Sequence, residues 1–263
     1  TRVRTANQDA HGVNGGIVYE YPEQEFKLKA GDGAVEIRPD QVKENIQILS
    51  IDEDNRLVEV GFSRGVTPPQ KMSISVGNPV RTGALRNAIY GFADSVIQGG
   101  SEYPAVESIL RRSVPKISSH QTGQPIAGGA SDNLQTIIEA VANLNNSSLF
   151  IQGPPGTGKT YTGSHIIAEL VSRGFRVGVS SNSHKAINNL LAAVEKTAEA
   201  KNIRFHGLKK STDDPATQFN GRLIHDVMTN PEILQSKADL VAGTAWLFAA
   251  MDKVLDFLFV DEA

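Results

Sequence analysis

An eight-residue stretch past the middle of the chain has the residue types and spacing of a phosphate-binding loop. Residues 153–160 read GPPGTGKT and match the pattern G-x-x-x-x-G-K-[ST]. The glycines let the backbone curl so that successive N–H groups point inward at an anion, and the start of a following helix adds positive potential. Lys159 then reaches the β and γ phosphates of a nucleotide, and the Thr160 hydroxyl takes a place on Mg²⁺. A loop that only connects two elements is the alternative, but it does not account for Lys159 and Thr160. The residues expected to contact the nucleotide are Gly153, Pro154, Pro155, Gly156, Thr157, Gly158, Lys159, Thr160 and Tyr161.

Two adjacent carboxylates, Asp261 and Glu262, follow an apolar stretch near the C-terminal end of the sequence. Asp261 is the expected Mg²⁺ ligand, acting through water. Glu262 is the candidate general base that orients and deprotonates an attacking water, a role typically worth about 10² to 10⁴ in rate. A solvated strand end is the alternative interpretation of such a pair. With the loop upstream, the pair predicts an ATP hydrolase with ATP and Mg²⁺ as cofactors.

Strands and helices alternate from residue 131 onward, a pattern that predicts a parallel sheet with helices on both faces. We expect strands at 147–152, 176–181, 202–207, 238–244 and 256–262. We expect helices at 131–144, across Ile166–Val171 with an end at Gly174, and across Ile187–Val194. The phosphate-binding loop then joins the first strand to a helix, which is the context that its pattern requires. The predicted fold class is α/β, of the P-loop NTPase type.

The N-terminal part of the chain has a different pattern. Period-two alternation between turn residues predicts strands at 16–21, 25–30, 34–38, 45–52 and 56–62. A small antiparallel sheet or barrel therefore forms the expected β-rich accessory domain, residues 1–78. Apolar residues that recur at three and four predict two helices in a connector over 79–130, which ends in a loop rich in Ser, Gly and Pro. The expected nucleotide-binding domain is 131–263.

The composition excludes several classes of function. The 263 residues include no cysteine, which excludes disulfides and thiolate metal sites and fits a reducing compartment. No apolar run approaches the roughly 18 residues of a membrane span, and the polar N-terminal sequence lacks the core of a signal peptide. We therefore expect a cytoplasmic protein with no membrane partner. The net charge of −3 neither supports nor excludes a nucleic-acid partner.

The sequence GPPGTGKT is shared by AAA+ ATPases and superfamily 1 helicases, and the spacing of the two motifs separates these classes. Asp261 follows Lys159 by 261 − 159 = 102 residues, which is longer than is usual in an AAA+ module. The extra length holds SSNSHKAINNLL and a strand ending in AGT, at positions that resemble the helicase motifs Ia and Ic. The chain thus resembles the first RecA-like motor domain of a superfamily 1B helicase, of the group containing the nonsense-mediated-decay helicase. This resemblance implies ATP-driven movement on single-stranded DNA or RNA.

The resemblance also implies contacts with a nucleic-acid backbone. Ser183 resembles the hydroxyl of motif Ia, His184 stands where many relatives have Asn, and Thr244 resembles the threonine of motif Ic. As alternatives, Ser183 and Thr244 each cap the helix that follows them. Gln135 precedes Gly153 by 153 − 135 = 18 residues, close to the spacing of the helicase Q motif, whose glutamine reads adenine. A solvent-facing helix glutamine is the alternative for Gln135.

Residues 19–34 (YEYPEQEFKLKAGDGA), 48–65 (ILSIDEDNRLVEVGFSRG) and 84–112 (ALRNAIYGFADSVIQGGSEYPAVESILRR) are similar to the segment that joins nuclease to motor in bacterial fusions of a RecB-like nuclease and a superfamily 1 helicase. This similarity implies a prokaryotic protein of DNA repair. It also implies a fragment, with a second RecA-like domain and its arginine fingers missing, so that the 263 residues alone bind ATP weakly and are nearly inactive. An AAA+ type remodelling ATPase and a nucleotide-binding scaffold without catalysis are the alternative functions.

The most basic stretch is KNIRFHGLKK, residues 201–210. It suits a strand of nucleic acid, because cations alternate with an aromatic side chain. The favoured alternative is a solvated strand at the edge of the sheet, where lysines oppose pairing with another chain.

Overall fold

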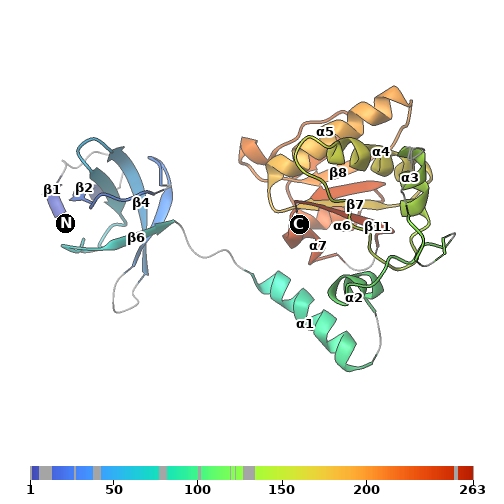
Figure 1. Cartoon of the computed structure of the whole chain (residues 1–263). Coiled ribbons are helices and arrows are strands. Elements are labelled where there is room, and N and C mark those ends of the chain that lie inside the picture. Colours follow the sequence, from blue (N-terminus) through green and yellow to red (C-terminus); the bar gives the residue numbers. More distant parts are fainter. Residues whose placement is uncertain are drawn as a thin grey trace. The chain divides into compact units, whose positions relative to one another are not determined.

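Figure 1 shows a computed structural model of the chain. It describes residues 2–5, 14–26, 28–37, 43–76, 82–99, 102–118, 120–121, 123–126, 134–251 and 254–262. The chain divides into two compact units, Thr1–Arg81 and Thr82–Ala263. The helices that follow the first unit therefore cluster with the α/β unit, and the three-part domain scheme stays a prediction.

The first unit is a six-stranded antiparallel sheet with the order β1-β2-β5-β4-β3-β6. Its strands are β1 Arg2–Thr5, β2 Asn14–Glu20, β3 Gly33–Ile37, β4 Lys43–Asp52, β5 Leu57–Phe62 and β6 Ser73–Val76. Alternate residues of the central strands, such as Ile48 and Val60, are fully buried in one core. Because β1 and β6 are the two ends of this order, the structure shows the antiparallel sheet but not a closed barrel.

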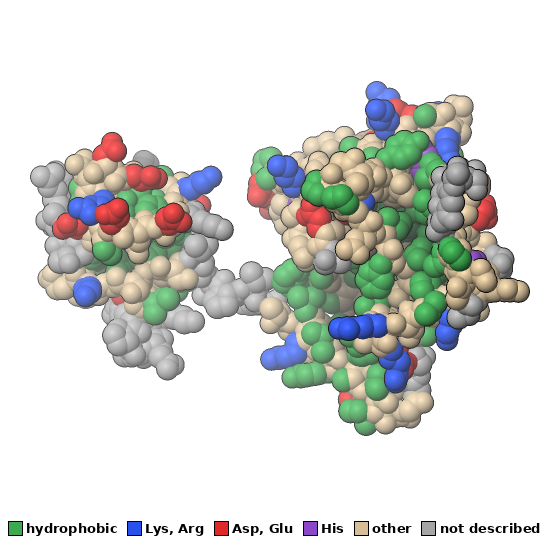
Figure 2. All heavy atoms as spheres, in the orientation of Figure 1, with side chains coloured by type: hydrophobic (Ala, Val, Ile, Leu, Met, Phe, Trp, Pro, Cys, Tyr) green, Lys and Arg blue, Asp and Glu red, His purple; other side chains and the backbone are tan. Residues whose placement is uncertain are grey.

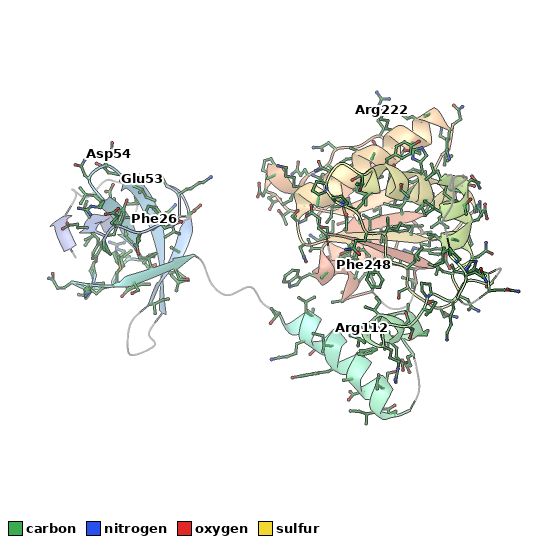
Figure 3. All side chains as sticks on the ribbon, viewed as in Figure 1. Phe26, Glu53, Asp54, Arg112, Arg222 and Phe248 are labelled. Carbon is green, nitrogen blue, oxygen red and sulfur yellow. The ribbon has the colours of Figure 1, made fainter. Side chains whose placement is uncertain are left out.

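The sequence predicted four of these strands with small shifts, missed β1 and β6, and placed a strand at 25–30 that does not form among the residues described there. Phe26, labelled in Figure 3, instead packs edge-on against Tyr21 with the ring centroids 5.2 Å apart. A turn follows, in which the Asp32 carboxylate accepts the Lys29 N–H at 2.8 Å. This local bonding replaces the strand pairing that the alternation had suggested.

The second unit contains helices and a parallel sheet. Its helices are α1 Gly83–Ile97, α2 Pro104–Leu110, α3 Leu134–Ala142, α4 Lys159–Ser172, α5 His184–Ala200, α6 Asn230–Leu234 and α7 Ala245–Phe248, with a 3-10 turn η1 at Pro215–Thr217. Its strands are β7 Val177–Ser181, β8 Gly207–Lys210, β9 Ile224–Val227, β10 Leu240–Gly243 and β11 Phe257–Asp261.

The five strands pair in parallel in the order β11-β7-β10-β8-β9, with helices on both faces (Figure 1). On one face, α3, α4 and α5 bury their apolar sides against residues such as Val177, Val179 and Leu240. On the other, α6 and α7 pack against Val241 and Leu208; Phe248 of α7, labelled in Figure 3, joins this second cluster. The predicted P-loop NTPase architecture is therefore shown at the level of a parallel α/β sheet.

Two predicted strands of this unit differ from the structure. Residues 147–152 form no strand: the Ser147 hydroxyl accepts the Lys116 N–H, and Ser148 bonds Ser108 of α2. The strand predicted at 202–207 begins instead at Gly207, where its pairing with β9 and β10 starts. β9 and α6 were not predicted.

Helices α1 and α2 were predicted from their apolar periodicity, and both form. Much of their apolar surface is nevertheless exposed, including Ile89, Ile97 and Leu110, and Figure 2 shows apolar side chains on the surface of this unit. Periodicity therefore located the helices but not a buried face. Within the described part of the chain, no helix has the length and apolar character needed to cross a membrane.

Candidate nucleotide-binding site

The GPPGTGKT loop adopts a backbone that only glycine takes without strain at two positions. Gly156 and Gly158 have φ angles of 84° and 85°, in the left-handed region. A Cβ at Gly153 would stand 2.5 Å from the Thr157 hydroxyl oxygen, so this glycine is required by close approach. The Thr157 hydroxyl donates to the Pro154 carbonyl at 2.8 Å, which closes the turn. The three glycines of the loop therefore have two structural reasons, positive φ at Gly156 and Gly158 and close approach at Gly153.

The Lys159 ammonium is held against the loop by two backbone carbonyls. It donates to the Gly153 oxygen at 2.6 Å and to the Pro154 oxygen at 3.0 Å. The side chain is half-buried, whereas Thr160 and Tyr161 are exposed. A cation is thus fixed over the loop without a carboxylate partner in the part of the chain that the structure describes, and an anionic ligand can compete for it.

Helix α4 begins directly after the loop, with Gly158 as its N-cap residue and no side-chain cap. The first intrahelical bond is made by the Thr162 N–H to the Gly158 oxygen at 2.8 Å. The N–H groups of Lys159, Thr160 and Tyr161 come before this first bond, so they have no partner within the helix. The helix dipole adds positive potential at the same place. The N-terminus of α4 can therefore bind an anion such as a phosphate.

The connection between α4 and β7 places this N-terminus at the carboxyl edge of the sheet. Residues 173–176 join the end of α4 to the start of β7, and α4 packs against β7 and α5. Because helix and strand run in opposite directions across so short a connection, the N-terminus of α4 and the C-terminus of β7 lie at the same edge. Ligands of parallel α/β sheets bind at this edge.

Asp261 ends β11 at the same edge. β11 pairs in parallel with β7, and Asp261 is opposite Ser181 in the register. The Glu262 N–H donates to the Asp261 Oδ1 at 3.2 Å, and Glu262 has a φ of 55°, an uncommon angle for a residue other than glycine. The chain therefore turns sharply at the carboxylate pair, and the Glu262 side chain is exposed.

The strand predicted at 147–152, which leads into the phosphate-binding loop, is not part of the described sheet. β11 is an outer strand of the described sheet. Apolar side chains are exposed on both segments: Phe150 is 71% exposed, Leu258 50% and Val260 56%. The loop lies at the carboxyl edge because α4 packs against β7, and Asp261 lies there because β11 pairs with β7. The two are not on adjacent strands.

The residues predicted to contact nucleic acid lie at the starts of two helices, Ser183 and His184 at α5 and Thr244 at α7. The Ser183 hydroxyl oxygen accepts the Ala186 N–H at 3.1 Å, so this side chain caps α5, as the alternative interpretation had it. Thr244 precedes α7 but makes no side-chain cap bond. His184, the first residue of α5, has its Nδ1 3.4 Å from the Lys209 ammonium. Burial, together with the charges of Lys209 and Lys210, lowers the pKa of His184. Contact with nucleic acid stays a prediction for all three predicted residues.

Lys209 corrects the expectation of a lysine-guarded edge. β8 lies between β10 and β9, and the Lys209 side chain is fully buried. Its ammonium donates to the Ser211 hydroxyl at 3.0 Å and to the Thr217 carbonyl, and lies 3.8 Å from the Asp226 carboxylate. Burial lowers the pKa of Lys209, against the opposing effect of Asp226.

The Asp226 carboxylate also accepts hydrogen bonds from groups other than Lys209. Its carboxylate accepts the Phe219 and Asn220 N–H groups at 2.8 and 2.7 Å, and the Ser211 hydroxyl. Burial acts to raise the pKa of Asp226, but the hydrogen bonds and Lys209 outweigh it, and the pKa is lowered. Sequence reasoning missed this buried network, because only the register of β8 with β9 brings Lys209 opposite Asp226.

Gln135 lies in α3 at the wall of a cavity of about 380 Å³. Its amide donates to the Glu139 carboxylate at 2.8 Å, and Glu139 in turn pairs with Arg173. Hydrogen bonds from Arg173, more than that from Gln135, lower the pKa of Glu139. The lining residues come from α3 and the segment before it: Ile117, His120, Ile126, Gln135, Thr136, Glu139 and Ala140. A cavity of this size is within the range of small-molecule sites.

The residues at the carboxyl edge fit a magnesium nucleotide. Left-handed glycines and the start of α4 suit phosphate, and Lys159 supplies a positive charge beside them. A hydroxyl at Thr160 and a carboxylate at Asp261 are oxygen ligands of the kind Mg²⁺ prefers. Bound there, Mg²⁺ would neutralise phosphate charge.

Comparison with known proteins agrees with this geometry. A family model described as an AAA domain matches residues 137–262. The chain is also similar to the DNA replication ATP-dependent helicase/nuclease DNA2 of Saccharomyces cerevisiae, with 28% identity over 137 residues. The match covers 50% of this chain and 9% of the yeast protein.

These matches coincide with the unit that carries the GPPGTGKT loop and Asp261. A P-loop domain of this type implies nucleotide binding, usually with Mg²⁺. Together, the parallel sheet, the loop and the two similarities support a superfamily 1 helicase-like P-loop domain in the second half of the chain.

Proposed function

We propose that this chain is the ATP-binding part of a nucleic-acid helicase or translocase, in which ATP hydrolysis drives movement on single-stranded DNA or RNA. The observation that carries the proposal is the loop that ends in α4, with left-handed Gly156 and Gly158 and the Lys159 ammonium held over it. The similarity to a protein named as an ATP-dependent helicase/nuclease supports the helicase class. The finer assignment, to superfamily 1B and to a bacterial fusion with a RecB-like nuclease, is part of the proposal.

Each predicted site residue has a role in this proposal. The loop and Lys159 bind the phosphates, and Thr160 and Asp261 hold Mg²⁺. Glu262 orients and deprotonates the attacking water. Gln135 reads adenine, which its place at the wall of a cavity supports. Ser183, His184 and Thr244 contact the nucleic-acid backbone, a role supported by the position of each at or next to the carboxyl end of a parallel strand.

The proposal is tested first by nucleotide binding to Lys159→Ala. Hydrogen bonds to a charged group contribute about 1.5–3 kcal/mol, so the dissociation constant for ATP should rise about 10- to 150-fold. A fluorescent ATP analogue and calorimetry both measure this. Lys196→Ala, an exposed lysine of α5, is the matched control and should bind as the unchanged chain does. Equal affinities of the two variants would contradict the phosphate-binding role.

Because the 263 residues alone are expected to hydrolyse ATP very slowly, hydrolysis is tested separately by introducing Glu262→Gln into a longer protein that also carries the second RecA-like domain; the change keeps the size of the side chain and removes the base. We expect unchanged ATP binding and a single-turnover hydrolysis rate lower by about 10² to 10⁴. The control is Glu232→Gln, a carboxylate in α6. A rate equal to that of the control would exclude Glu262 as the base.

A further inference from the structure

The hydroxyl of Ser181 is buried and has no hydrogen-bond partner among the described residues. Ser181 is the last residue of β7 and is 3% exposed. Buried polar side chains in native proteins are nearly always hydrogen-bonded, so an orphan hydroxyl needs an explanation. A ligand-dependent partner is one of the recognised explanations.

The sheet places this hydroxyl beside the Asp261 carboxylate. Ser181 and Asp261 are opposite each other in the parallel register of β7 and β11. Val177 and Val179 of β7 belong to the core under α4 and α5, and Phe257 and Phe259 of β11 pack against the same core. Because side chains alternate along a strand, Ser181 and Asp261 both project from the face that carries α4.

The phosphate-binding loop lies at the same edge, because α4 runs antiparallel to β7 and begins with Lys159. In this structure the Asp261 carboxylate accepts the Glu262 N–H, at a distance of 3.2 Å. Carboxylates that hold a metal are themselves hydrogen-bonded by neighbouring groups, which fix their orientation. A serine hydroxyl opposite Asp261 can supply such a bond.

We propose that Ser181 is a positioning residue for Asp261. Its hydroxyl donates a hydrogen bond to the Asp261 carboxylate when that carboxylate holds the water shell of a magnesium nucleotide, and so orients it toward the metal. The proposal rests on the proposed nucleotide-binding function. It accounts for both observations: the hydroxyl has no partner among the described residues, and it lies opposite the one carboxylate of β11 in the register.

The test compares Ser181→Ala with Ser180→Ala in the 263-residue chain. Ser180 is the matched control because it precedes Ser181 on β7, is 6% exposed and projects from the opposite face. The measurement is ATP-analogue affinity across a Mg²⁺ titration and in EDTA, with the thermal midpoint of each variant. Loss of a group that orients a metal ligand typically costs 10- to 100-fold in metal affinity.

We expect Ser181→Ala to raise the half-saturating Mg²⁺ concentration about 10-fold or more, to leave the affinity in EDTA unchanged, and to melt at or above the unchanged chain. Removing an unpartnered hydroxyl should not destabilise the nucleotide-free protein. In an Asp261→Asn background, the effect of Ser181→Ala on Mg²⁺ should disappear.

A Mg²⁺ dependence equal to that of Ser180→Ala would overturn the proposal, as would an effect that persists with Asn at position 261. Failure of Ser181→Ala to fold would also overturn it, since the hydroxyl would then be structural. If the unchanged chain binds no nucleotide, the proposed function fails; if it binds and Ser181→Ala behaves as the control, only the role of Ser181 fails.

Discussion

Replacing Lys209 by Met tests how much the buried hydrogen-bond and ion-pair network between β8 and β9 contributes to the free energy of unfolding of the second unit. The Lys209 ammonium is fully buried, bonds the Ser211 hydroxyl and the Thr217 carbonyl, and lies 3.8 Å from Asp226. Met keeps most of the apolar stem and removes the charge. Asp226 would then remain buried as an anion without its cation.

The expected loss of unfolding free energy depends on the hydrogen bonds that Asp226 retains. Removing one partner of a buried ion pair costs about 3–5 kcal/mol. Asp226 still accepts two backbone N–H groups and the Ser211 hydroxyl, so we expect the lower end, about 3 kcal/mol. With a urea m-value of about 2–3 kcal/mol/M, the unfolding midpoint should fall by about 1–1.5 M.

The assay is urea unfolding followed by tryptophan fluorescence. Trp246 is the only tryptophan of the chain and lies in α7, so the signal reports the second unit alone. Lys210→Met is the matched control: it changes the next residue of β8, whose ammonium donates to the Ser211 carbonyl at 2.7 Å and to no other group among the described residues. We expect about 1.5 kcal/mol for this control, because it loses one hydrogen bond from a charged group but leaves no buried carboxylate without its cation.

A loss below about 1 kcal/mol for Lys209→Met, or a loss no larger than that of Lys210→Met, would refute this reasoning. Asp226→Asn combined with Lys209→Met should cost less than the sum of the two single changes, because the pair is then lost only once. Simple additivity would show that the two groups do not interact.

Two further predictions concern single residues of the same unit. The pKa of His184 is lowered in the folded state, so below the ordinary histidine pKa of about 6.5 the unfolded chain binds more protons than the folded chain, and stability falls as the pH falls. His184→Asn should make the urea midpoint fall less steeply between about pH 7 and 5. Parallel curves for the variant and the unchanged chain would contradict this prediction. Gly158 has a φ of 85°, so Gly158→Ala should lower the free energy of unfolding by about 1–2 kcal/mol and weaken nucleotide binding. Gly163 lies in the middle of α4, where an added Cβ would meet only Leu190 at 3.7 Å. Gly163→Ala should therefore raise the free energy of unfolding by up to about 1 kcal/mol. Thermal melts with the same sign for both glycines would show that backbone angle is not the deciding factor.

The phosphate-binding loop could be located from sequence because its geometry is local. Glycine at 156 and 158 permits the left-handed angles, and α4 begins at Lys159 at the end of the loop, although the strand predicted before the loop does not form. The helices α1, α2 and α5 were also predicted, since an apolar period of three to four residues is a local property. The roles of Lys159, Asp261 and Glu262 remain predictions that the binding and hydrolysis assays will test.

Sequence alone could not decide which strands are neighbours, because pairing depends on contacts between distant segments. The sequence of KNIRFHGLKK favoured an edge strand over a nucleic-acid groove, but β8 lies inside the sheet and buries Lys209 against Asp226. Residues 147–152 have the composition of a strand yet are held by Ser108 and Lys116 outside the sheet. The register of β7 with β11 sets Ser181 beside Asp261. The sequence by itself determined the anion-binding loop, whereas tertiary structure decided which polar groups are buried together and which hydroxyl lies next to the carboxylate.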